Sequence, residues 1–116
     1  MLKMMALAGA FFIGLTGSAN AWEAGSRIAA ATICWERTDA HHLASMHESK
    51  GHEAAADVFF EYVMSGKCEY HKSLFTVYLV KRLESYVIDG VHHSLWSVND
   101  KNLFGYIILP AETRQS

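Results

Sequence analysis

Two cysteines, Cys34 and Cys68, constrain the fold of this 116-residue chain more than any other feature. An even number of cysteines in an exported chain favours a disulfide, because the compartments outside the cytosol are oxidising. A redox-active role needs a Cys-x-x-Cys pair or a lone activated thiol, and the sequence has neither. We therefore expect a Cys34–Cys68 disulfide, which would stabilise a small domain by roughly 3–4 kcal/mol.

Residues 1–21 have the three parts of a secretory signal peptide. They begin Met-Leu-Lys, continue through an apolar run from Met4 to Thr16, and end in Ala19-Asn20-Ala21. The apolar run is shorter than the ~20 residues that span a bilayer. We expect cleavage before Trp22, no stable membrane anchor afterwards, and a secreted or periplasmic protein.

The rest of the chain is long enough for one domain, residues 22–110, and ends in a polar tail, residues 111–116, that we expect to be disordered. Its charge is weakly acidic, with 10 Lys and Arg against 12 Asp and Glu in the full sequence. A nucleic-acid-binding domain carries a basic patch, which this composition does not supply. Nucleic acid is therefore not an expected partner.

The region between the two cysteines carries helical signals. Thr38 or Asp39 can cap a first helical turn, and Gly51 then interrupts the pattern. Beyond Gly51, apolar residues recur at helical spacing as far as Ser65-Gly66: Ala54, Ala55, Val58, Phe59, Tyr62 and Val63. We expect this helix, residues 53–65, to cover the apolar face of a sheet. Gly51 either ends a first helix or lies within one longer helix.

After Cys68 the sequence is typical of β-strands. Residues 74–80, LFTVYLV, are β-branched and aromatic, as a buried strand should be. Residues 84–88 lead into Asp89-Gly90, a strong signal for a two-residue hairpin. Strands over residues 93–98 and 103–109 follow, separated by a polar turn and ended by Pro110. The short segment over residues 27–34 is expected to be extended.

These elements predict an α+β fold: a disulfide-stapled helical N-terminal half packed on a small antiparallel β-meander of three to four strands. The short, tightly turned, aromatic-rich strands over residues 74–109 resemble the small barrels of bacterial SH3-like domains. The resemblance implies a barrel shape and carries no function.

The aromatic residues of the meander are the candidates for a binding surface. Alternating aromatic residues on a small sheet usually pack as cross-strand pairs, but a domain of this size cannot bury all of them. Exposed Trp and Tyr side chains favour protein binding. We expect the partner-binding residues to be Trp96, Tyr86, Tyr106, His92 and His93, and the partner to be a protein or peptide.

A histidine-rich stretch, residues 38–60, supports an alternative function. On one unbroken helix, His41, Glu48 and His52 would form a stripe, and Glu48 and His52 could chelate zinc or copper. Two or three ligands from one helix make a weak site, and a solvated polar face is the simpler interpretation. Seven histidines in the chain could also make its net charge depend on pH near 6.5.

Catalytic signals are missing from the sequence. No nucleophile elbow accompanies the serines and histidines, and the acidic residues show no distinctive pairing. We expect a non-catalytic interaction or accessory module without a cofactor, with a weak histidine-based metal-binding protein of the same compartment as the alternative.

Overall fold

The computed structural model describes residues 22–100 and 102–111. The elements in chain order are β2 (Arg27–Cys34), α1 (Arg37–Lys50), α2 (His52–Met64), β3 (Cys68–Ile88), β4 (Val91–Asp100) and β5 (Leu103–Pro110). The predicted signal peptide, residues 1–21, lies outside the described residues. So does the predicted disordered tail, apart from Ala111.

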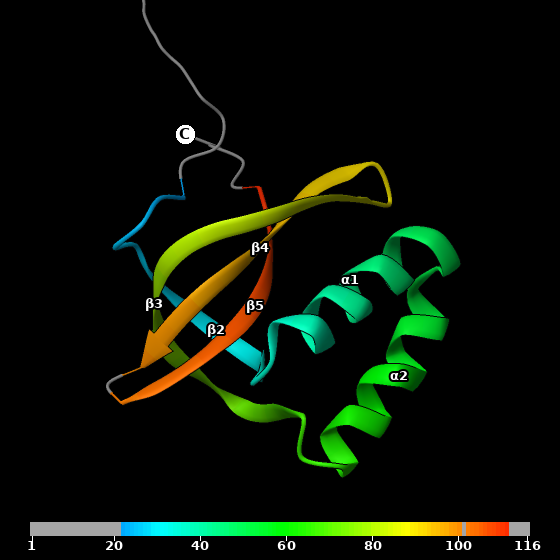
Figure 1. Ribbon diagram of the computed structural model, residues 1–116, viewed down its shortest axis with the longest axis horizontal. Helices are drawn as coiled ribbons and strands as arrows, with labels where there is room; N and C mark the ends of the chain where they lie inside the picture. The colour runs from blue at the N-terminus through cyan, green and yellow to red at the C-terminus, as the bar shows by residue number, and fades with distance from the viewer. Residues whose placement is uncertain (1–21, 101, 112–116) are drawn as a thin grey trace, which may run out of the picture.

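Four antiparallel strands form one closed sheet in the order β2-β3-β4-β5 (Figure 1). The sheet closes because β2 pairs with β3 along its length and also meets β5, where Cys34 lies opposite Tyr106. The α+β class is confirmed. The predicted helical N-terminal half is not confirmed, because β2 precedes both helices and belongs to the sheet. The likeness to SH3-like barrels stays a prediction.

The Asp89-Gly90 hairpin is present, with φ values of 53° and 78° at these two residues. A type I′ turn needs positive φ at both central residues, and its twist matches that of the two strands that it joins. The strand before it differs from expectation, because residues 68–88 form one strand in place of two. Its pairing with β4 shifts register between Leu79 and Lys81 and again between Arg82 and Glu84. Such bulges bend a strand, so β3 curves around the barrel without ending.

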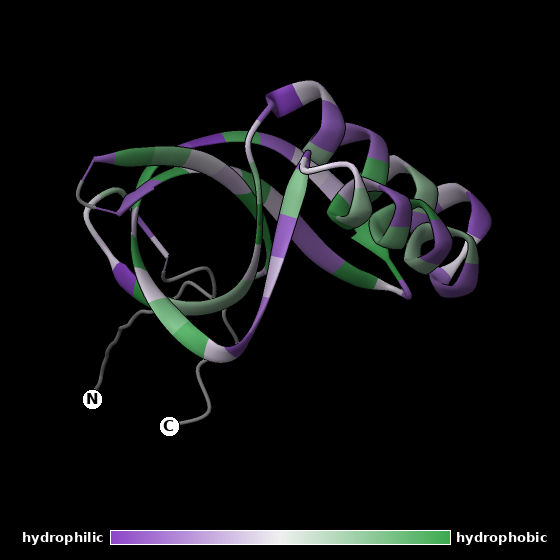
Figure 2. Cartoon of the chain, turned by 90° about the horizontal axis from the view of Figure 1, so that it is seen from below, coloured by the Kyte–Doolittle hydropathy of each residue, from purple (hydrophilic) through white to green (hydrophobic). Residues whose placement is uncertain are grey.

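The core has two parts. Inside the barrel, buried side chains from all four strands pack together: Ile28, Ile33, Val77, Leu79, Trp96, Val98 and Ile107. The second part lies between the helices and the outer face of the sheet, and its buried members are Cys34, Ala40, Leu43, Ala44, Cys68, Tyr86, Ile88 and Leu95. Figure 2 shows the strands as a ring with both helices on one side of it. The helices therefore cover only one side of the barrel.

Helix α1, more than α2, covers the sheet. Ala40, Leu43 and Ala44 of α1 are buried, whereas α2 buries only Ala55. The sequence predicted the covering role for residues 53–65 alone, whereas α1 buries more residues against the sheet. The apolar residues Val58, Phe59, Tyr62 and Val63 of α2 are partly buried against the same core. Helix α2 thus forms a second wall beside α1.

Gly51 separates the two helices. Its backbone has φ 98° and ψ 175°, a conformation that an L-residue with a side chain rarely adopts. The helix therefore ends at Lys50, and α2 begins in a new direction at His52 (Figure 1). The continuous helix on which the predicted metal stripe depended does not form.

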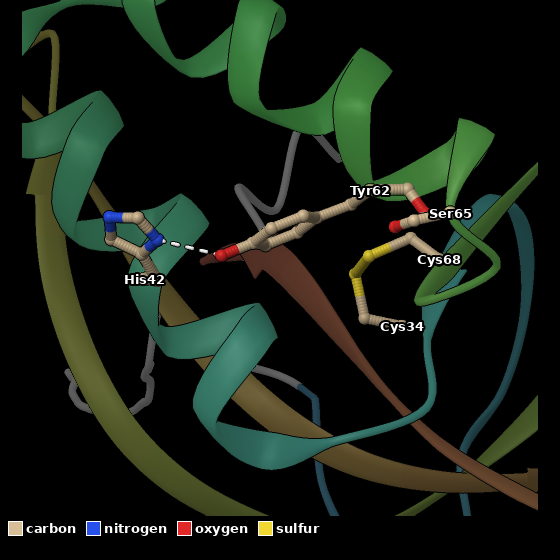
Figure 3. Close-up of a disulfide and its surroundings, with 5 residues drawn as sticks. All are labelled: Cys34, His42, Tyr62, Ser65 and Cys68. Atoms are coloured by element: carbon tan, nitrogen blue, oxygen red, sulfur yellow. Dashed lines mark hydrogen bonds between the residues drawn. A yellow bond between two sulfur atoms is a disulfide. The ribbon is translucent and has the colours of Figure 1, made fainter.

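The Cys34–Cys68 disulfide is confirmed and joins the two ends of this helical hairpin (Figure 3). The two cysteines also face each other in the pairing of β2 with β3, with their Cα atoms 3.9 Å apart. Near the disulfide, Tyr62 of α2 bonds through its hydroxyl to Nδ1 of His42 on α1 at 2.8 Å. A covalent bond and a hydrogen bond thus hold α2 beside α1.

The substitution Gly51→Ala tests whether the helix is broken at Gly51, because a broken helix and a continuous one predict changes of opposite sign in the free energy of unfolding. A Cβ at this position would have no atom within 4 Å, so the substitution adds backbone strain without a clash. We expect Gly51→Ala to lower the free energy of unfolding by about 1–3 kcal/mol, measured by urea denaturation.

A continuous helix would give the opposite result, because alanine is favoured over glycine inside a helix by about 1 kcal/mol. Lys50→Ala, one position earlier on the exposed side of α1, is the control and should change little. Stabilisation by Gly51→Ala would contradict the helical hairpin.

Candidate functional site

The predicted aromatic binding surface does not form as a unit. Trp96 is 3% exposed and packs inside the barrel, and Tyr86 is 4% exposed beneath α1. Both are core residues, so neither can form an exposed binding surface. Closure of the barrel buries one face of β4 and the helices cover the opposite face of the sheet, and strand alternation alone cannot reveal this.

The other three predicted partner-binding residues remain accessible. Tyr106 and His93 are partly buried and line a groove between the helices and the sheet. His92 is exposed on β4 and does not line this groove. Two of the five predicted residues therefore meet at one surface.

The predicted metal ligands are held apart by different partners. His41 lies 2.8 Å from a carboxylate oxygen of Glu84, and Glu48 accepts a hydrogen bond from the amide of Val87 at 2.7 Å. His52 begins α2, beyond the break at Gly51. Within residues 22–100 and 102–111, no group of three or more His, Cys, Asp or Glu side chains is arranged to hold a metal ion. The stripe is wrong because its helix is broken.

The groove between the helices and the sheet has a volume of about 760 Å³. Side chains from both helices and all four strands line it: Thr32, Ile33, Cys34, Ala40, Leu43, His47, His52, Ala55, Ala56, Phe59, Ile88, Asp89, Val91, His93, Tyr106, Ile107, Ile108 and Pro110. Most of these are apolar. Ligand sites of this size are typically apolar with a few polar groups that fix orientation.

The groove includes a place where the barrel seam opens. Strands β2 and β5 pair only at Cys34 and Tyr106. The two strands approach closely there, so that a Cβ added to Gly105 would lie only 2.6 Å from side-chain atoms of Ile33. In the same antiparallel register Ile33 would lie opposite Ile107 and Thr32 opposite Ile108, and neither is assigned as a pair. Thr32 and Ile108 both line the groove.

The main-chain groups of Ile108 face the open seam, where β2 and β5 are not assigned as a pair. The amide of Ala111 donates to the carbonyl of His92 at 2.7 Å, and β4 pairs with β5 without a register shift. Hydrogen-bonded residues alternate along an antiparallel pair. Ile107 and Leu109 therefore direct their main-chain groups toward β4, and those of Ile108 point away from it, toward the open seam.

The free edge of β5 is short. Pro110 has no N–H, and its carbonyl accepts a hydrogen bond from the indole of Trp22 at 3.2 Å. Proline and a covered carbonyl both protect a strand edge against uncontrolled pairing. Between Tyr106 and Pro110, Ile108 is the residue whose main-chain groups face the open seam.

Three imidazoles lie at the hairpin end of the groove. His47 on α1 and His52 on α2 have ring centroids 5.2 Å apart, and His93 on β4 also lines the groove. Among the described residues, Nδ1 of His47 is a buried side-chain atom with no hydrogen-bond partner. Burial lowers the pKa of His47, and the neighbouring His52 and His93 lower it further, against an opposing effect of Asp89. His47 is therefore mainly neutral at pH 7.

A polar network on the other side of α1 is structural. Glu84 receives hydrogen bonds from Arg37 at 3.0 Å and from the hydroxyl of Tyr86 at 3.0 Å, and His41 lies beside both. Burial alone would raise the pKa of Glu84, but these hydrogen bonds and the nearby positive charges lower it overall. Burial and the Glu84 carboxylate raise the pKa of Tyr86. The network ties the start of α1 to β3.

Sequence reasoning missed most of the groove. Ala40, Leu43 and His47 follow helical spacing and could have been recognised as one face of α1. The open seam at Ile108 and the meeting of His47 with His52 have no sequence signal, because both depend on how the chain closes.

Comparisons with family models, curated proteins and solved structures find no match to this chain. In the part of the chain that the structure describes, no helix is long and apolar enough to cross a membrane. The disulfide is consistent with an extracellular or otherwise oxidising compartment.

The lowered pKa of Glu84 predicts how its contribution to stability depends on pH. A carboxylate whose pKa is lowered by folding contributes stability above its unfolded value, here 4.5, and loses it as the pH falls through the folded value. We expect Glu84→Gln to cost about 1–2 kcal/mol at pH 7. The cost should shrink as the pH falls through the lowered pKa of Glu84, because the wild-type carboxylate is then protonated as well.

Urea denaturation of both proteins at a series of pH values from 7 down to 2 measures this difference. Asp57→Asn on the exposed side of α2 is the control. An equal cost of Glu84→Gln across the whole series would show that the charge of Glu84 contributes nothing.

Proposed function

We propose that this protein is a non-catalytic interaction module that binds an apolar, extended segment of a partner protein in the groove between the helical hairpin and the barrel. The observation that carries the proposal is the groove of about 760 Å³, with its mainly apolar lining. The predicted class of function is kept, and its location moves from the aromatic face of the meander to this groove. Tyr106 and His93 belong to both.

Physical reasons favour a peptide segment as the occupant. An apolar groove gains free energy from burying apolar side chains, at roughly 25 cal/mol per Å². A strand edge beside it can satisfy the main chain of an extended segment, as in other domains that bind peptides by strand addition. Ile108 supplies such an edge directly beside the apolar lining.

The proposed compartment is the extracellular space or the periplasm. The disulfide between Cys34 and Cys68 supports it, since such bonds persist in oxidising surroundings. The leader-like composition of residues 1–21 supports the same assignment. A histidine-based metal site is not proposed, because the predicted ligands are held apart.

Filling the groove tests the proposal. Ala56 and Asp57 are neighbours on α2 and both are exposed, but only Ala56 lines the groove. We expect Ala56→Trp to reduce binding to an array of random octapeptides by about tenfold or more, since the indole would occupy the apolar volume. Asp57→Trp, the matched control, should bind as the wild type does.

Melting temperatures of both variants verify that they are folded. Equal binding by Ala56→Trp and Asp57→Trp, or no apolar peptide bound by the wild type, would contradict the proposed function.

A further inference from the structure

The two ends of the groove differ in chemistry. At one end Tyr106 and the disulfide meet the beginning of α1, and the surface is apolar apart from the tyrosine hydroxyl. At the other end, near Pro110, His47, His52 and His93 converge from α1, α2 and β4. A ligand that fills the whole groove therefore contacts apolar side chains at the Tyr106 end and hydrogen-bonding imidazoles at the Pro110 end.

At the imidazole end of the groove, one polar atom lacks a hydrogen-bond partner among the described residues. Nδ1 of His47 is buried without a hydrogen-bond partner among the described residues. Buried polar atoms in native proteins are nearly always paired, and an unpaired one calls for an explanation such as a missing ligand. A neutral imidazole has one N–H donor and becomes a double donor when protonated, so three imidazoles together suit an anionic oxygen acceptor.

Two carboxylates, Asp89 and Glu48, lie near the imidazole end of the groove. Asp89 is the single carboxylate among the groove-lining residues, and it is exposed at the hairpin turn. Glu48, which follows His47 on α1, is engaged with the amide of Val87. Nδ1 of His93 donates to the carbonyl of Val91 at 2.9 Å, so Nε2 is the atom that His93 offers to a ligand, and it donates when the ring is protonated. A carboxylate is the acceptor that forms the stronger, charge-assisted hydrogen bonds with such a group.

The strand edge sets the direction of the ligand. All strand pairs of this sheet are antiparallel, and β5 runs toward the imidazole end, where Pro110 lies opposite His93. A segment that pairs antiparallel with β5 at Ile108 has its N-terminal residues at the imidazoles. A carboxylate at that end must come from a side chain, because the C-terminus of the segment lies at the opposite end.

We propose that the groove binds an extended peptide segment of a partner protein that runs antiparallel to β5, pairs with the main chain of Ile108, and places an N-terminal Asp or Glu side chain against His47, His52 and His93. This inference rests on the proposed function and specifies its ligand: an acidic residue followed by apolar residues.

Three libraries of octapeptides test the ligand class. Each is acetylated and amidated, so no terminal charge contributes, and its other positions are random apolar residues. The first library has Asp at the second position, the second has Asn there, and the third has Asp at the seventh position. Binding is measured by fluorescence polarisation at pH 6.5 with EDTA present, so that adventitious metal ions cannot bridge peptide and protein.

We expect the first library to bind about tenfold more tightly than either of the others, since a charge-assisted hydrogen bond is stronger than a neutral one. His93→Gln should remove most of this preference. His92→Gln, the adjacent exposed histidine on β4 that does not line the groove, should leave it intact. In the complex, hydrogen exchange of the Ile108 amide should slow.

The other outcomes are distinguishable. Equal binding of the Asp and Asn libraries, both weakened by Ala56→Trp, would overturn the acidic ligand and leave the groove as a peptide site. Tighter binding of the third library, or unchanged exchange at Ile108, would overturn the antiparallel arrangement. Binding of every library unaffected by Ala56→Trp would overturn the proposed function and this inference together.

Discussion

The pairing of Cys34 with Cys68 is the constraint on which the rest of the structure depends. The two residues are joined by the disulfide and also face each other in the β2–β3 ladder. The chain between them must therefore leave one point and return to it. It does so as two helices of 14 and 13 residues, with the turn midway at Gly51. The helical hairpin follows from this closure together with the backbone freedom of glycine.

The groove is a consequence of the same closure. Helix α1 packs on the sheet, and α2 returns beside it as a second wall of the groove. His47 and His52 flank the turn, and its reversal brings their rings within 5.2 Å. On a straight helix these residues, five positions apart, would point in directions about 140° apart. The break at Gly51 thus abolishes the predicted metal stripe and creates a different group of histidines.

Much of the fold could be predicted from local signals. The disulfide follows from cysteine number, the hairpin from Asp89-Gly90, and the last two strands from their aromatic and β-branched residues. The continuity of β3 could not be predicted, because bulges permit a long strand to bend where the pattern suggests two. The site was less predictable. The burial of Trp96 depends on barrel closure, and the opening between Thr32 and Ile108 depends on where two distant strands diverge.

The central claim is that the chain between the cysteines folds back on itself at Gly51, and pulsed EPR tests it directly. Nitroxide labels carried by unnatural amino acids at Thr38 and Glu61 leave the native disulfide intact. Thr38 lies one turn before His42 and Glu61 lies beside Tyr62, and these two side chains are hydrogen-bonded across the helical hairpin at 2.8 Å. The account predicts one narrow label-to-label distance below about 25 Å. A distance near 35 Å, as one continuous helix between the labels would give at about 1.5 Å per residue, would contradict it.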